Sequence, residues 1–120
     1  MKIFEVIEMA DDIKPNAFSD KTKCAWISAL EGDIASNIFL MAKCEADKLR
    51  YDEDNMDAEL LVEHPYDDIY VLWLCAKIDE ANGEYEKYAN SMQSYNARYK
   101  DFMLWFCATY DPAQGYEERE

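Results

Sequence analysis

The chain has 120 residues, half of them hydrophobic, and a formal net charge of −14 at pH 7. This length predicts one domain, and the hydrophobic content excludes a disordered chain. The acidic excess argues against binding nucleic acid through its phosphates, because that mechanism needs clustered Lys and Arg.

Glycine and proline are rare, with three of each, and the long segments lack the alternation of β-strands. We therefore predict an all-α fold, a small bundle of about three to four helices in a single domain over residues 1–110. The N-terminal MKIFEVIEM has no apolar signal core, and no uncharged run reaches 18 residues. These features predict a soluble protein that stays in the cytoplasm and makes no membrane contact.

The first two helices are predicted over residues 3–13 and 19–43. The first ends before Lys14-Pro15, because proline pushes the preceding residue out of the helical region. Ser19 is the expected N-cap of the second helix. Gly32 lies inside that helix, where it is either tolerated or allows another helix to approach; we favour close packing.

Residues 45–63 lose the helical pattern and are mainly acidic, which predicts a loop or mobile arm anchored by Leu60, Leu61 and Val62. Asp52, Asp54 and Glu63 match three positions of a calcium-binding EF-hand loop. The position that requires glycine is occupied by Asp57, so we interpret the segment as a solvated acidic loop.

A seam of apolar residues with steps of three and four runs through residues 67–110 and is typical of a coiled-coil helix. Its phase passes unbroken through Asn82-Gly83, so we predict one continuous helix from about residue 66 or 67 to 110. Such a rod would be about 65 Å long and would need partners. The alternative is a break at Asn82-Gly83 that folds Asp67 to Ala81 against Glu84 to Tyr110.

Both ends of this stretch, Ile69–Ile78 and Phe102–Ala108, are apolar on nearly all faces and must be covered on more than one side. Trp73 and Trp105 are each either core residues or anchors for a neighbouring subunit, and we favour the core for Trp73. Residues 111–120 are predicted to be a flexible charged tail. The candidate protein-interface residues are Trp105, Tyr85, Tyr88, Tyr95, Tyr99 and Tyr110.

No arrangement of residues predicts catalysis. His64 precedes Pro65 without a nucleophile at a signature spacing, and the chain has no glycine-rich phosphate loop. Four widely spaced cysteines and one histidine favour reduced core thiols over a zinc site. We predict no enzyme activity, no cofactor and no catalytic, cofactor-binding or metal-binding residue.

Five short stretches of the sequence form a recognisable set: KPNAFS (14–19), WISALEGDI (26–34), PYDDIY (65–70), IDEANGEY (78–85) and YANS (88–91). They resemble small prophage proteins of Gram-positive bacteria, of the head–tail connector or head-completion type found in long-tailed phages, and the resemblance spans about residues 1–110. It implies an all-helical protomer in a ring that bridges portal and tail, with no catalytic residue. Residues 45–63 and 111–120 would then contact the neighbouring ring.

The leading hypothesis is a structural connector that assembles as an oligomeric ring, first in the bacterial host cytoplasm and then at the head–tail junction of the virion. Its partners would be copies of itself and a portal or tail adaptor protein, without sequence-specific nucleic-acid binding. The alternative is an acidic helical module that mimics DNA and inhibits a restriction or regulatory protein. A third possibility is an accessory subunit of an enzyme.

Overall fold

A computed structural model of the chain describes residues 1–110, apart from the side chain of Tyr110. The described part is helical, without a strand, which confirms the predicted all-α class; an isolated bridge joins Lys2 to Glu59. The predicted tail, 111–120, lies outside the described residues. In chain order the helices are α1 (Ile3–Ile13), α2 (Asp20–Asn37), α3 (Lys43–Ala46), α4 (Asp68–Ala81) and α5 (Tyr85–Tyr110).

The first helix has its predicted bounds, and the predicted N-cap of the second is confirmed. The Lys14 N–H donates to the carbonyl of Ala10 at 2.8 Å and closes α1 directly before Pro15. Ser19 Oγ accepts a hydrogen bond from the backbone N–H of Thr22 at 3.2 Å. Local rules of helix capping therefore account for both of these boundaries.

The second helix ends at Asn37, so its predicted end at residue 43 is wrong. Leu40 takes a left-handed backbone conformation with φ of 54°. The N–H of Met41 then donates to the carbonyl of Ala35 at 2.9 Å, which closes the last turn. Glycine usually occupies such a position, and its absence here left the sequence without the expected signal for the end of the helix.

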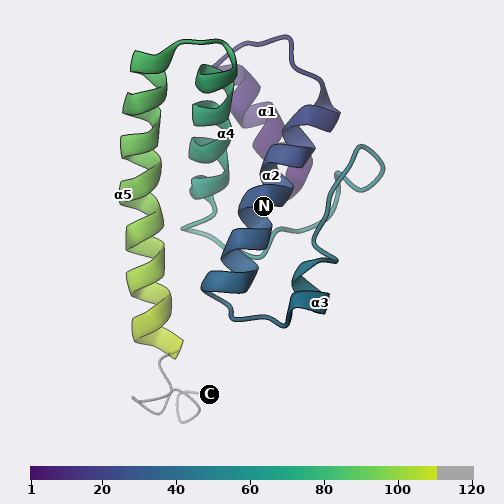
Figure 1. Cartoon of the computed structure of the whole chain (residues 1–120), viewed down its shortest axis with the longest axis vertical. Helices are drawn as coiled ribbons and strands as arrows, with labels where there is room; N and C mark the ends of the chain where they lie inside the picture. Colours follow the sequence, from purple (N-terminus) through teal and green to yellow (C-terminus); the bar gives the residue numbers. More distant parts are fainter. Residues whose placement is uncertain (111–120) are drawn as a thin grey trace.

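The chain breaks at Asn82-Gly83 and folds back (Figure 1). The continuous helix over residues 67–110 is therefore wrong, and the alternative prediction of two helices folded against each other is confirmed. Gly83 has φ of +73°, a conformation that glycine adopts without steric cost. The Gly83 N–H donates to the carbonyl of Glu80, and that of Glu84 to the carbonyl of Asp79, both at 3.0 Å. The seam is unbroken because α4 and α5 each turn an apolar face towards the other.

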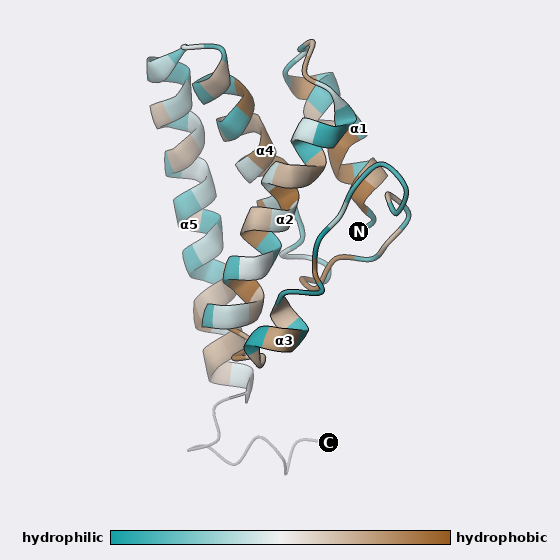
Figure 2. Ribbon diagram, turned by 45° about the vertical axis from the view of Figure 1, so that its right-hand side comes forward, coloured by the Kyte–Doolittle hydropathy of each residue, from teal (hydrophilic) through white to brown (hydrophobic). Residues whose placement is uncertain are grey.

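Helix α4 is the centre of the fold and packs against α1, α2 and α5 (Figure 1). Much of α4 and the inner face of α1 consist of hydrophobic residues (Figure 2). Helical neighbours on several sides explain why Ile69–Ile78 is apolar on nearly all faces. Trp73 is half-buried, and its Nε1 donates to the carbonyl of Trp26 at 3.0 Å. The fully buried α4 residues include Ile69, Tyr70, Leu74 and Ile78.

The acidic segment 45–63 is attached to the bundle rather than free. It begins with the last residues of α3 and then runs back to the start of α1, where the N–H of Phe4 donates to the carbonyl of Met56 at 3.0 Å. Leu60 and Val62 are buried in the core, as predicted for anchors of this segment. Its apolar residues therefore hold an otherwise polar stretch against the helices.

Candidate protein-interaction surface

The α4–α5 hairpin separates the tyrosines predicted to form an interface. Tyr85 is exposed at the first turn of α5, whereas Tyr95 is buried with its ring 5.2 Å from that of Trp73. Burial raises the pKa of the Tyr95 phenol well above its ordinary value. Tyr88 and Tyr99 are partly buried. Tyr95 is therefore a core residue of the fold and does not lie on the surface.

Trp105 remains partly exposed. It belongs to a group of exposed apolar residues that the sequence analysis did not predict as a group. Leu40 is 78% exposed, Leu104 56%, Trp105 42% and Met103 38%. We call these four residues the apolar end. The last predicted interface residue, Tyr110, has a side chain outside the described residues. Met103, Leu104 and Trp105 are consecutive in α5, and exposed apolar patches are typical of protein-interaction surfaces.

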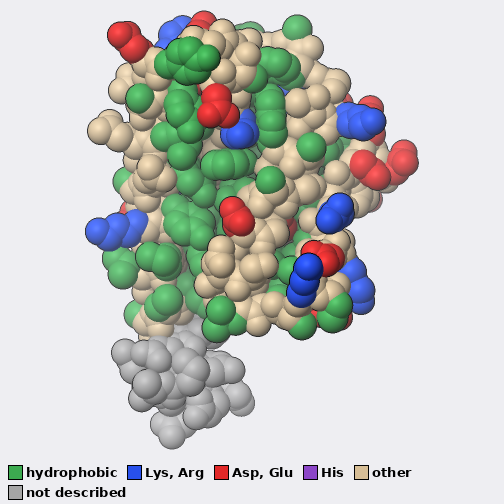
Figure 3. Space-filling model, in the orientation of Figure 1, with side chains coloured by type: hydrophobic (Ala, Val, Ile, Leu, Met, Phe, Trp, Pro, Cys, Tyr) green, Lys and Arg blue, Asp and Glu red, His purple; other side chains and the backbone are tan. Residues whose placement is uncertain are grey.

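Two elements contribute to the apolar end. The left-handed closure of α2 turns Leu40 outward, and the preceding Phe39 stacks on Phe106 of α5 with ring centroids 4.9 Å apart. Trp105 lies with its ring 5.2 Å from that of Tyr66, ahead of α4. On the face shown in Figure 3, hydrophobic side chains form a band over α5 and α4 with few charged groups among them. The apolar end thus joins the end of α2 to the last turns of α5.

The signal for this surface was present in two places. The stretch Phe102–Ala108 is free of charge and apolar on all faces of its helix. Phe39 and Leu40 extend the apolar surface of the second predicted helix beyond one stripe. Only the early end of α2, however, shows that Leu40 leaves the helix and becomes exposed.

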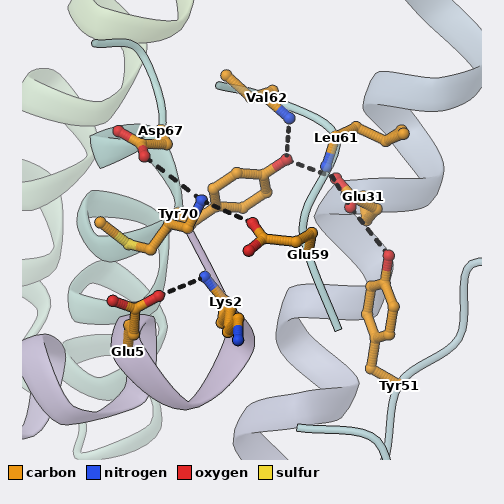
Figure 4. Close-up of polar contacts among 10 residues, drawn as sticks. Lys2, Glu5, Glu31, Tyr51, Glu59, Leu61, Val62, Asp67 and Tyr70 are labelled. Carbon is orange, nitrogen blue, oxygen red and sulfur yellow. Dashed lines mark hydrogen bonds and ion pairs between the residues drawn. The ribbon is translucent and has the colours of Figure 1, made fainter. Parts of the chain in front are cut away.

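A buried polar cluster surrounds Glu31 of α2, whose side chain is fully buried (Figure 4). Its Oε1 accepts from Tyr70 Oη at 2.6 Å, and its Oε2 accepts from Tyr51 Oη at 3.0 Å and from the Leu61 N–H at 2.9 Å. Tyr70 Oη in turn accepts from the Val62 N–H at 3.0 Å. Burial raises the pKa of Glu31, although these hydrogen bonds to the carboxylate oppose the change.

This cluster ties three parts of the fold together. It joins α2 to α4 and to the segment before α4, and no buried side-chain polar atom of the described residues lacks a hydrogen-bond partner. Burial, followed by the adjacent Glu31 charge, raises the pKa of the Tyr70 phenol far above its ordinary value. A proton donor bound so tightly is a poor acid at neutral pH.

Three further polar contacts hold the helices together. Asp79 of α4 is buried and contacts Lys14 Nζ at 2.9 Å, while its Oδ2 also accepts from Ser91 Oγ of α5 at 2.7 Å. Lys23 of α2 is buried and pairs with Asp11 of α1 at 2.8 Å. Breaking a buried pair leaves a charge without compensation, so these contacts favour one arrangement of the helices.

A hollow of about 560 Å³ lies between α2 and the residues that follow α3. Its α2 wall consists of small side chains around Gly32, and Arg50 and Tyr51 form part of the opposite wall. A Cβ added at Gly32 would meet nothing within 4 Å. The expectation that Gly32 allows another helix of this chain to pack closely is therefore wrong, and the glycine is tolerated at the edge of open space.

Within residues 1–110, no three His, Cys, Asp or Glu residues lie close enough together to hold a metal ion. In the calcium-loop match, Asp52 Oδ1 instead accepts the N–H of Asp54 at 2.9 Å within a turn. His64 is exposed in the turn before α4. None of the described helices has the length and apolar content needed to cross a membrane.

Comparison of the chain with protein-family models, with curated proteins and with solved structures finds no match.

Proposed function

We propose that the chain is a non-enzymatic structural protein of the phage or prophage head–tail connector type. It assembles as a ring of copies that bridges a portal and a tail adaptor, in the host cytoplasm and then in the virion. The observation that carries the proposal is the apolar end, where Leu40, Leu104 and Trp105 leave hydrophobic surface in water. The resemblance of the five short sequence stretches supplies the type of assembly.

The grounds for self-association differ from those expected for a rod. The α4–α5 hairpin covers much of the tyrosine seam within one protomer, so the seam no longer requires a partner. The apolar end does, because burial of apolar area is favourable by about 25 cal/mol per Å². Since Phe102–Ala108 carries no charge, contact through this stretch would bury none of its own charged side chains.

An acidic ring suits a passage for DNA. The net charge of −14 repels phosphates, and a duplex that must slide past a surface should not be held by it. An interface that joins the apolar end to a different surface of the next copy is head-to-tail. Such an interface closes into a ring when its rotation allows.

The proposal is tested by measuring the mass of the protein by light scattering, alone and with a purified portal ring. Leu104→Glu places a charge on the apolar end at an exposed position, so the protomer should fold while assembly and portal retention are lost. Gln93→Glu adds the same charge to an exposed part of α5 outside the apolar end, and it should assemble like the wild type. A wild-type protein that is monomeric at every concentration and is not retained by portal contradicts the proposal.

A second candidate, a DNA-mimicking inhibitor, is favoured by the distribution of the acids. Residues 45–68 contain ten acidic and two basic residues, and most of these carboxylates are exposed. Such a protein would bind a DNA-processing enzyme in competition with duplex DNA, and added salt would weaken the complex. Salt-resistant binding to portal and no binding to such enzymes would reject it.

A further inference from the structure

Residues 51–62, which we call the strap, cross from α2 to the start of α1 and return to the core. Both ends of the strap bind one carboxylate. Tyr51 Oη donates to Glu31 Oε2 at 3.0 Å, and the Leu61 N–H donates to the same oxygen at 2.9 Å (Figure 4). Glu31 also accepts from Tyr70 of α4, so one buried side chain fastens the strap to two helices.

Between these attachments the strap is polar and strongly charged. It contains five acidic residues and no basic one: Asp52, Glu53, Asp54, Asp57 and Glu59. All five are exposed, and their mutual repulsion favours a more extended segment. The backbone hydrogen bonds that tie the strap to the start of the chain include Ile3 N–H to Ala58 and Leu60 N–H to Met1, at 3.3 and 3.1 Å.

We propose that the strap opens as a unit while the helices stay folded, and that Glu31 is the residue that holds it closed. The segments that open locally in proteins are those with few buried apolar contacts. Leu60 and Val62 are the fully or nearly fully buried apolar residues of the strap, and both lie at its C-terminal end. The charged part between Tyr51 and Leu60 is attached by hydrogen bonds and by the partly buried side chains of Met56 and Ala58.

The chain carries its own reporter of this opening, Cys24 of α2. The N–H of Tyr51 donates to Ser28 Oγ at 2.8 Å, and Ser28 Oγ donates to the carbonyl of Cys24 at 2.8 Å. Cys24 is fully buried. Burial, together with the charges of Asp20, Asp52 and Glu53, raises its pKa to about 11. Ser28 thus links the start of the strap to the backbone of Cys24, and opening of the strap should give solvent access to this thiol.

Cys75 of α4 is a matched internal control. It is nearly as buried as Cys24, and burial likewise raises its pKa to about 11. The charged groups that act on it are Lys14, Asp79 and Asp11, none of which belongs to the strap. Exposure to solvent removes the burial that raises the pKa of both thiols, so the two should then react alike. Strap opening should therefore expose Cys24 alone, whereas global unfolding exposes both.

The experiment compares the rates of iodoacetamide labelling of Cys24 and Cys75 by peptide mass spectrometry, in the full chain. Glu31→Gln replaces an acceptor of the Leu61 N–H by an amide that cannot fully substitute for it. We expect Cys24 to be labelled at least about fivefold faster in this variant, the effect of about 1 kcal/mol, with Cys75 unchanged. Hydrogen exchange should rise over residues 51–62 and stay constant in α4 and α5.

Asp33→Asn is the control for the change of carboxylate to amide, because Asp33 is exposed on the same helix; it should leave both labelling rates unchanged. Tyr51→Phe removes a single hydrogen bond at a half-buried position, and it decides the question if Glu31→Gln does not fold. Equal acceleration of the two thiols, or no acceleration of Cys24 in the deciding variant, would overturn the proposal.

Discussion

Two stretches of similar composition, Ile69–Ile78 in α4 and Phe102–Ala108 in α5, have different surroundings. The first is enclosed by α1, α2 and α5. The second is covered on one side, where Phe102 is buried, and leaves Leu104 and Trp105 exposed on others. An apolar stretch therefore predicts that its side chains are buried. Whether the same chain buries them depends on the arrangement of the other helices.

The largest expected effect comes from testing this contrast with the same substitution at each stretch. Leu74→Ala removes a fully buried side chain of α4 and should lower the free energy of unfolding by about 2–5 kcal/mol, because it leaves a cavity. Leu104→Ala should change it by less than about 0.5 kcal/mol. Urea denaturation of the monomer measures both. Equal losses would show that the two stretches are equally enclosed.

The loss of a buried tyrosine hydroxyl can be compared with the loss of a more exposed one in the same way. Tyr70→Phe removes the donor to Glu31 and the acceptor of the Val62 N–H, and unpaired buried groups should cost about 1–3 kcal/mol. Tyr99→Phe, on the partly exposed seam of α5, should cost less than about 0.5 kcal/mol. Thermal unfolding followed by circular dichroism gives the order, and a reversed order would contradict the structural role of the Glu31 cluster.

Two glycines should respond with opposite signs. Gly83→Ala puts a side chain at φ of +73° and should destabilise the hairpin by about 1–2 kcal/mol. Gly32→Ala adds a methyl group inside a helix where nothing lies within 4 Å, and it should stabilise the protein by about 0.5–1 kcal/mol. If Gly83→Ala were neutral, the left-handed turn between α4 and α5 would be in doubt.

A smaller effect, spread over a range of pH, is expected from Glu31. Burial raises its pKa in the folded protein, so the folded state takes up a proton at a higher pH than the unfolded chain, whose glutamate has a pKa of about 4.3. The wild type should therefore gain stability relative to Glu31→Gln as the pH falls through the folded pKa. The charged groups around the cluster are Glu59, Asp67 and the Met1 amine. Urea denaturation of both proteins from neutral pH to about 5 measures the difference, and its absence would show that Glu31 is not desolvated.

The fold was predictable where local chemistry determines it. Proline at position 15 and serine at position 19 set the boundaries around the first loop, and Leu60 and Val62 anchor the acidic segment as expected. The break at Gly83 was predicted as the alternative rather than the preferred reading, because the apolar phase is the same whether the helix continues or folds back on itself. The hydrophobic pattern alone does not distinguish two helices facing each other from one helix facing a partner.

The Glu31 cluster and the apolar end differed in how far the sequence could predict them. Glu31 lies four residues after Ile27 and three before Ile34, both buried, so a carboxylate in phase with the apolar stripe was a signal that could have been used. Its partners Tyr51 and Leu61 come from a segment without a pattern and could not be identified. Trp105 was among the predicted interface residues, whereas Leu40 was not, because its exposure follows from an unusual closure of α2.

The turn at Gly83 also sets the order in which contacts can form. Helices α4 and α5 are joined by three residues, so their pairing closes a very short loop. The contact between Leu60 and Met1, in contrast, closes a loop of most of the first half of the chain. Short-range contacts have the lower entropic cost of closure. Ile78→Ala should therefore slow folding, while Leu60→Ala should mainly accelerate unfolding, as stopped-flow kinetics would show. The hairpin would then act as the nucleus on which the N-terminal half of the protein assembles.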